Sequence, residues 1–268
     1  MQNKNPKISI KDLNIYYKNS TSNKLILKNI NLDICQGENL SILGCNGSGK
    51  TSLLKCLTKN INHNLILQGD ILLDDKSIKK YTSKELARKV ALLSQNSQLL
   101  FEHTIFDTIM MGRYAYNNNF YNNNFNKANN NKIVLDALEV VGLLDHKDSY
   151  LSTLSGGQLQ RVFIAKIIAQ DPDIILLDEP TNHLDIKYQI ELINFFKDWS
   201  KQYNKTIIGV FHDVNLAMLL TPSTILLHDK AIKFNGNIND IINTDLLNIV
   251  YDTDIKSYML DSLKKWCN

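Results

Sequence analysis

A glycine-rich octapeptide constrains the fold of this chain more than any other feature of its sequence. It matches the pattern G-x-x-x-x-G-K-[ST] and lies between an apolar segment, NLSILG, and a helix-compatible segment, TSLLKCLTKN. Its residues are Gly44, Cys45, Asn46, Gly47, Ser48, Gly49, Lys50 and Thr51, and Ser52 follows. A strand, a tight turn and a helix in this order predict an α/β fold whose turn presents backbone N–H groups to a phosphate. The alternative is an ordinary glycine-rich turn.

Two side chains add chemistry to this loop. In a loop of this kind Lys50 reaches the β and γ oxygens of a nucleoside triphosphate, and the hydroxyl of Thr51 can coordinate Mg²⁺. We therefore predict that residues 44–52 bind a nucleotide. The loop alone does not distinguish between GTPases, kinases and ATPases.

A pair of adjacent carboxylates ends the apolar segment IILLDE. Ligands of open α/β sheets bind at the carboxyl ends of the strands, so Asp178 and Glu179 are expected beside the phosphate loop. Asp178 would hold Mg²⁺, usually through water, and Glu179 would orient the water that attacks the γ-phosphate. The alternative is a strand that simply ends at exposed acids.

The segment LSGGQ, followed by a helical pattern, predicts a second anion-binding element. Its polar and glycine residues are Ser155, Gly156, Gly157 and Gln158. An ordinary helix N-cap is the alternative. Two phosphate-binding elements with a single Mg²⁺ site favour a dimer.

Together these motifs make the sequence similar to the ATP-binding subunits of ABC transporters over nearly the whole chain. The resemblance implies an α/β fold with a P-loop NTPase (RecA-like) core, an N-terminal antiparallel β subdomain and an inserted α-helical subdomain. It implies ATP and Mg²⁺ as cofactors and a dimer in which LSGGQ of one subunit closes over the ATP of the other. Lys50 and Glu179 are then expected to take part in hydrolysis.

Four further family positions can be matched to this sequence. Tyr17, in L-x-I-x-Tyr, resembles the aromatic residue that stacks on adenine, although the adjacent Tyr16 is an alternative. Gln95 resembles the glutamine that contacts Mg²⁺ and the attacking water. Asp185, in Asn-His-Leu-Asp, resembles the loop that crosses the dimer interface, and His212 the histidine that contacts the γ-phosphate.

The hydrophobic pattern predicts a single domain of three parts. Residues 1–94 and 170–268 would form the catalytic core, and 95–169 a helical subdomain. The expected strands are 8–17, 27–34, 39–44, 90–94, 173–179, 206–211 and 223–228, and the expected helices are 83–89, 104–113, 133–141, 156–170 and 186–202. Residues 117–131 carry ten asparagines, a composition that predicts a surface loop.

Composition excludes several other classes of protein. Thirty basic and 27 acidic residues give a net charge of +3 without a basic run, so we expect no nucleic-acid partner. No stretch approaches the roughly 18 to 20 apolar residues that a membrane helix needs. The four cysteines show no C-x-x-C spacing, so neither a zinc site nor a disulfide framework is predicted.

Finer features are similar to the importers of iron-siderophore, haem and cobalamin. These are TIFDTIMMGRYAY, the Asp-Ile-x-x-Gln of LDIKYQ, and FHDVNLA. The resemblance implies a cytoplasmic ATPase held on the inner face of the membrane by permease subunits, working with a substrate-binding protein, and pairing with itself or a paralogue. A metal-ion importer, an exporter, a non-transport ABC ATPase and a P-loop kinase are the alternatives.

Overall fold

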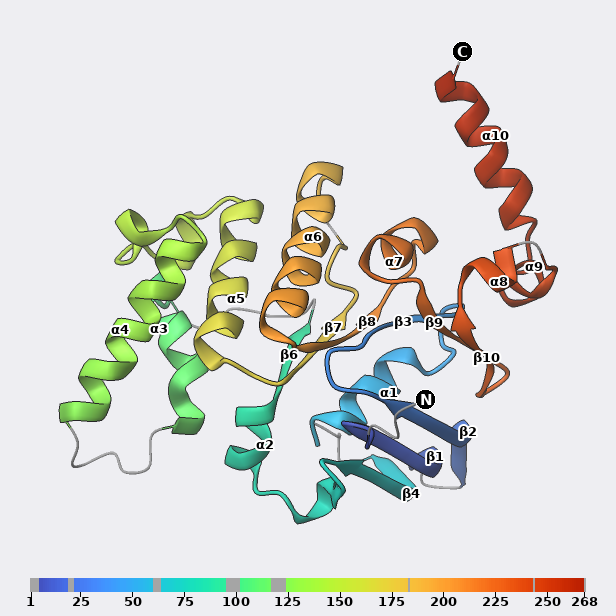
Figure 1. The fold of residues 1–268 in the computed structure, drawn as a ribbon, viewed down its shortest axis with the longest axis horizontal. Helices are drawn as coiled ribbons and strands as arrows, with labels where there is room; N and C mark the ends of the chain where they lie inside the picture. The colour runs from blue at the N-terminus through green and yellow to red at the C-terminus, as the bar shows by residue number, and fades with distance from the viewer. Residues whose placement is uncertain are drawn as a thin grey trace.

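The computed structural model describes residues 5–18, 22–59, 64–94, 102–116, 124–182, 184–242 and 244–267. In these residues the strands form two sheets, and helices cover the larger sheet and extend beyond both of its edges (Figure 1). This arrangement confirms the predicted α/β fold class.

The smaller sheet is antiparallel, with the order β2-β1-β4-β5. Its strands are β1 (Ile8–Lys18), β2 (Asn23–Ile34), β4 (Leu65–Leu73) and β5 (Lys76–Ser77). The predicted strands 8–17 and 27–34 are both present, and β2 begins earlier, at Asn23. β4 was not predicted. It contains Gly69 in a left-handed conformation (φ 96), where a Cβ would lie 2.5 Å from the backbone oxygen of Asp12 in β1.

The larger sheet has the order β10-β9-β3-β8-β7-β6 and is parallel except for β10, which pairs antiparallel with β9. Its strands are β3 (Asn39–Leu43), β6 (Val90–Ser94), β7 (Ile174–Asp178), β8 (Thr206–Val210), β9 (Ser223–His228) and β10 (Ala231–Asn237). The central strands are short and apolar because both of their faces are covered. In β7, Ile175 and Leu177 enter one hydrophobic core, whereas Ile174 and Leu176 enter the other.

The described helices fall into three groups along the chain. The core carries α1 (Lys50–Leu57), α2 (Ser83–Lys89), α6 (Ile186–Tyr203), α7 (Val214–Leu220) and the 3₁₀ turn η1 (Ile78–Lys80). Between β6 and β7 lie α3 (Ile105–Met110), η2 (Met111–Tyr116), α4 (Asn124–Val140), η3 (Leu144–His146), η4 (Leu151–Thr153) and α5 (Gly156–Gln170). After β10 come α8 (Asn239–Ile242), α9 (Leu246–Tyr251) and α10 (Ile255–Cys267).

The middle group matches the segment expected to be helical. Helices α3, α4 and α5 pack against one another. Among the described residues between β6 and β7, the only β pairing is an isolated bridge between Thr104 and Tyr150. The predicted helix 104–113 is shorter, because α3 ends at Met110 and a 3₁₀ turn follows.

The prediction of a loop over residues 117–131 was wrong in its second half. Helix α4 begins at Asn124, and residues 117–123 lie outside the described part of the chain. Asn130 is buried in this helix and its Oδ1 accepts a hydrogen bond from Arg113 Nε at 3.0 Å. One turn further, Val134, Ala137 and Leu138 are fully or almost fully buried. Packing of the helix therefore overrides the weak helix propensity of asparagine.

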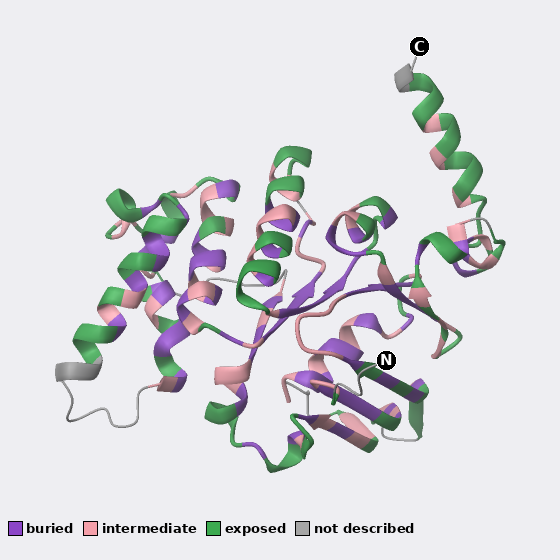
Figure 2. Cartoon of the chain, viewed as in Figure 1, coloured by how far each residue is buried: buried purple, intermediate pink, exposed green. Residues whose placement is uncertain are grey.

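Burial separates the body of the molecule from its C-terminal end. Figure 2 shows buried residues concentrated along the larger sheet and the inner faces of its helices, whereas most of α10 is exposed. No helix in the described ranges is long and apolar enough to cross a membrane.

Candidate nucleotide site

The predicted phosphate loop connects the end of β3 to the start of α1. Gly44 follows β3 directly, and a Cβ there would collide with the backbone oxygen of Leu227 in β9. Gly49 precedes α1 in a left-handed conformation (φ 99), which glycine adopts without strain. The loop thus carries the chain from the strand into the helix and leaves the first N–H groups of α1 without helical partners, as an anion site requires.

Lys50 is the first residue of α1 and lies almost wholly buried under the loop, with 4% of its surface exposed. Its Nζ donates hydrogen bonds to the backbone oxygens of Gly44 at 2.7 Å and Cys45 at 3.0 Å. Burial lowers the pKa of Lys50, and the negative charges of Glu179 and Asp178 partly oppose this shift. The amine is therefore fixed beside the loop.

Asp178 ends β7 beside the first turn of α1. Its Oδ1 accepts a hydrogen bond from Thr51 Oγ1 at 2.8 Å, and only 8% of its surface is exposed. Burial raises the pKa of Asp178, while the hydrogen bond from Thr51 works in the opposite direction. A carboxylate and a hydroxyl that meet in this way are the oxygen ligands that Mg²⁺ prefers. Their donor set therefore fits the ion that the sequence analysis assigned to them.

Glu179 is held by two neighbours at the carboxyl ends of β7 and β8. Its Oε1 lies 2.6 Å from His212 Nε2, and its Oε2 accepts a hydrogen bond from Asn182 Nδ2 at 2.7 Å. The backbone of Glu179 is left-handed (φ 52) and its N–H donates to the oxygen of Val210 at 3.2 Å. The structure thus brings Glu179 and His212 together, as the family positions imply, and adds Asn182.

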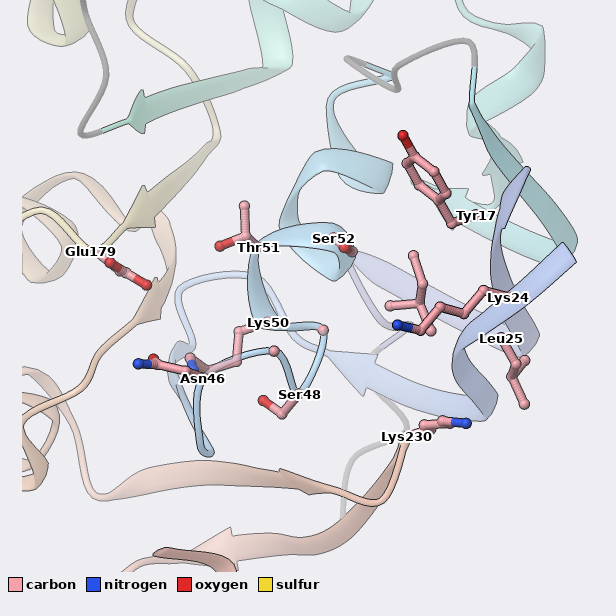
Figure 3. A pocket seen from close by; sticks show the side chains of 13 residues that line it. Tyr17, Lys24, Leu25, Asn46, Ser48, Lys50, Thr51, Ser52, Glu179 and Lys230 are labelled. Atoms are coloured by element: carbon pink, nitrogen blue, oxygen red, sulfur yellow. The ribbon is translucent and has the colours of Figure 1, made fainter. Parts of the chain in front are cut away.

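A pocket of about 550 Å³ contains the phosphate loop and Glu179 (Figure 3). It is lined by Tyr17, Lys24, Leu25, Ile26, Asn46, Gly47, Ser48, Gly49, Lys50, Thr51, Ser52, Glu179 and Lys230. Tyr17 lines this pocket, whereas the adjacent Tyr16 does not. The volume is within the range of small-molecule sites.

Five residues at this site were missed by the sequence analysis: Lys24, Leu25, Ile26 and Lys230, which line the pocket, and Asn182, which contacts Glu179. Lys24 and Lys230 come from β2 and from the turn between β9 and β10, and they reach the pocket only because the two sheets are neighbours. Asn182 was placed in the loop after the acidic pair without a role at Glu179. Its spacing of three residues from Glu179 is the one local signal that could have indicated this contact.

The segment LSGGQ lies elsewhere. Ser155 caps α5, since its Oγ accepts from Gln158 N–H at 3.3 Å and its own N–H donates to Gln158 Oε1 at 3.0 Å. None of residues 154–158 lines the pocket, and Figure 1 shows α5 and α1 in different parts of the molecule. The chain therefore does not bring its two predicted phosphate-binding elements together.

The remaining predicted residues are described only in part. Asp185 is the N-cap residue of α6, although its side chain makes no capping hydrogen bond. Gln95 and His183 lie outside the described residues.

Comparison with known proteins places the chain in a family. The family model described as "ABC transporter" matches residues 27–182. An uncharacterised ABC transporter ATP-binding protein of Methanocaldococcus jannaschii is 36% identical over 92% of this chain and 92% of its own length. The petrobactin import ATP-binding protein of Bacillus subtilis is 35% identical over 89% of this chain and 92% of its own length.

Solved structures give the same result. An inward-facing metal-chelate type ABC transporter superposes with a TM-score of 0.75 at 28% identity, covering 92% of this chain and 90% of the other. A dimeric ATP-binding cassette bound to ADP and Pi superposes with a TM-score of 0.72 at 27% identity, covering 86% of this chain and 98% of the other. The chain therefore belongs to the ABC transporter family and is one of its ATP-hydrolysing, ATP-binding subunits.

Proposed function

We propose that this chain is the ATPase of an importer for ferric siderophores. The observation that carries the proposal is the 35% identity with the petrobactin import ATP-binding protein over 89% of the chain. The segments TIFDTIMMGRYAY and FHDVNLA, which are similar to those of iron-siderophore, haem and cobalamin importers, support the same cargo class.

The nucleotide site supports a mechanism of positioning rather than covalent catalysis. Mg²⁺ bound at Thr51 and Asp178 would neutralise the charge that develops on the phosphates. Lys50 and the N–H groups of the loop would bind the phosphates, and Tyr17 would stack on adenine. Glu179 would orient the attacking water, because its carboxylate stands at the edge of the pocket. His212 and Gln95 would contact the γ-phosphate and the water.

A dimer completes the site in this proposal. LSGGQ is remote from the pocket of its own chain, so Ser155, Gly156, Gly157 and Gln158 would bind the ATP held by a second subunit, with Asp185 crossing the interface. The dimeric cassette among the structural relatives supports this arrangement. Residues 95–169 would act as the helical subdomain that carries LSGGQ. Permease subunits would hold the dimer on the inner face of the membrane, with a substrate-binding protein delivering the cargo.

Uptake by cells that lack this chain tests the proposal. Ferric petrobactin, a ferric hydroxamate, haem and cobalamin are supplied in parallel, with and without the wild-type gene. Restored uptake of a ferric siderophore is the expected result, and Glu179→Gln, which retains the fold but not the carboxylate, is expected to restore none. Rescue of haem or cobalamin uptake alone would contradict the cargo class. Full rescue by Glu179→Gln would contradict the role of that residue.

A further inference from the structure

The hydroxyl of Tyr251, at the end of α9, lies against the first glycine of the phosphate loop. Gly44 N–H donates a hydrogen bond to Tyr251 Oη at 3.3 Å, although the two residues are 207 positions apart. We propose that Tyr251 is a positioning residue for nucleotide binding, which holds the phosphate loop in the shape that receives the phosphates. The inference rests on nucleotide binding at this loop, as in the proposed function, but not on the cargo.

The backbone N–H of Gly44 needs a hydrogen-bond acceptor from outside the sheet. The parallel pairing of β3 with β9 ends at Leu43, so Gly44 lies one residue beyond the ladder. Its backbone is pressed so closely against Leu227 that no side chain fits there. A buried backbone N–H that loses its partner costs free energy comparable to a lost hydrogen bond. The phenol of Tyr251 supplies the acceptor.

The same glycine connects Tyr251 to the lysine of the loop. The backbone oxygen of Gly44 accepts the shorter of the two hydrogen bonds from Lys50 Nζ, at 2.7 Å. Both backbone polar groups of Gly44 are therefore occupied, one by Tyr251 and the other by Lys50. A shift of Gly44 would move the anchor of the amine that the site presents to a nucleotide.

Helix α9 holds Tyr251 firmly enough to act in this way. Leu247 and Val250 of the same helix are buried in a hydrophobic core that also includes Ile238 and Ile241, and Tyr251 packs against that core. The helix ends at Asp252 in a left-handed cap, which fixes the position of its last turn. Burial also raises the pKa of Tyr251, so its hydroxyl stays neutral at physiological pH. The C-terminal segment thereby contributes to a loop that is built near the N-terminus.

The Tyr251→Phe variant tests this role, because it keeps the ring and removes the hydroxyl. Without the acceptor the loop samples other conformations, and a nucleotide must order it on binding. We expect the dissociation constants for MgATP and for MgADP to rise by a similar factor, about two- to tenfold, the range that one hydrogen bond supplies. The value of kcat at saturating ATP should not change, since Glu179 and His212 are untouched. The Gly44 amide of the nucleotide-free variant should exchange its hydrogen faster.

Tyr258→Phe is the matched control, because it makes the same change in α10 at a side chain that is 67% exposed. It should leave both affinities unaltered. The inference would be overturned if the Tyr251→Phe protein had a lower melting temperature but bound MgATP and MgADP with wild-type affinity. The tyrosine would then have only a structural role. The same titration measures the affinity of the wild-type protein for MgATP. A wild-type protein that binds no MgATP would overturn the proposed function as well.

Discussion

At the scale of single residues, Glu179 shows how much of this site depends on its immediate neighbours. A non-glycine residue in a left-handed conformation costs about 1 to 3 kcal/mol and persists only where the surroundings enforce it. Here the backbone bond to Val210 and the side-chain bonds to His212 and Asn182 supply that enforcement. We therefore expect Asn182 to help position the Glu179 carboxylate, a role that the sequence analysis did not assign.

Asn182→Ala is expected to lower kcat for ATP hydrolysis by about ten- to 150-fold, because a hydrogen bond to a charged group contributes about 1.5 to 3 kcal/mol. The KM for ATP should stay close to that of the wild type, since the phosphate loop is not altered. Steady-state kinetics separate the two parameters. Asn239→Ala, at an exposed asparagine of α8, serves as the control. Wild-type kcat in Asn182→Ala would show that His212 alone positions the carboxylate.

Asp178 illustrates a conflict between stability and function. Burial raises its pKa, so the charged form is penalised in the folded chain, and this residue's contribution to stability falls as the pH rises through that pKa. At neutral pH Asp178→Asn removes the penalty and keeps an oxygen that can accept from Thr51. We expect the melting temperature of the nucleotide-free protein to rise by about 1 to 4 °C and Mg²⁺-dependent hydrolysis to be lost.

Thermal unfolding without nucleotide measures this effect. Asp148→Asn is the control, because the Asp148 side chain is 80% exposed and its contact with Lys147 should contribute little. A lower melting temperature for Asp178→Asn would mean that the carboxylate stabilises the empty site.

At the scale of elements, local signals were sufficient where they were strong. The spacing of Thr82 and Glu85 is typical of a capping box at the start of a helix, and α2 has one, with Thr82 N–H donating to Glu85 Oε2 at 2.7 Å. The short apolar strands were found for a similar reason, because segments buried on both faces have a continuous apolar pattern. Strand β4 and the first half of α4 were missed, whereas the predicted helix 133–141 coincides with the second half of α4, because tertiary contacts decide the parts that were missed. In α4 these contacts include the bond from Arg113 to the buried Asn130.

Two substitutions at Ser155 can separate its capping of α5 from its proposed contact with the second subunit. Ser155→Ala and Ser155→Arg both remove the capping hydroxyl, so each should destabilise the protein by about 1 kcal/mol. Only the arginine should also block the second subunit by its bulk. We therefore expect Ser155→Ala in a Glu179→Gln background to dimerise with ATP, and Ser155→Arg in the same background to remain monomeric while still binding ATP. Size-exclusion chromatography with light scattering distinguishes them, and an ATP-dependent Ser155→Arg dimer would contradict the assignment of LSGGQ to the partner's nucleotide.

At the scale of the whole molecule, charges from distant parts of the sequence join the two sheets. Lys7 Nζ lies 2.8 Å from Asp74 Oδ1 and 2.8 Å from Asp173 Oδ2, and Lys89 Nζ lies 2.6 Å from Asp74 Oδ2. Asp74 belongs to the turn between β4 and β5, whereas Asp173 directly precedes β7. The sequence could not predict this network, since it exists only after both sheets have formed. The motifs of the nucleotide site were predictable because each of them is contiguous in the chain.

The network should make stability depend on acid pH. Burial alone would raise the pKa of Asp74, but hydrogen bonds from Lys7 and Lys89 hold it below its ordinary value. Such a carboxylate stabilises the fold above its unfolded pKa, and the contribution is lost as the pH falls below about 4. Asp74→Asn should therefore reduce the free energy of unfolding at pH 7 by up to about 1 kcal/mol. The effect is modest because solvent screens the carboxylate. The difference from the wild type should persist at about pH 5 and shrink below about pH 4. Asp75→Asn is the matched control for Asp74→Asn. Both residues have a left-handed backbone, with φ 49 at Asp74 and φ 58 at Asp75, and the Asp75 carboxylate accepts only an exposed hydrogen bond from Asn5 among the bonds that the structure describes. Urea unfolding of both variants across this range measures the effect, and an equal loss in the two would mean that the turn, rather than the network, carries it.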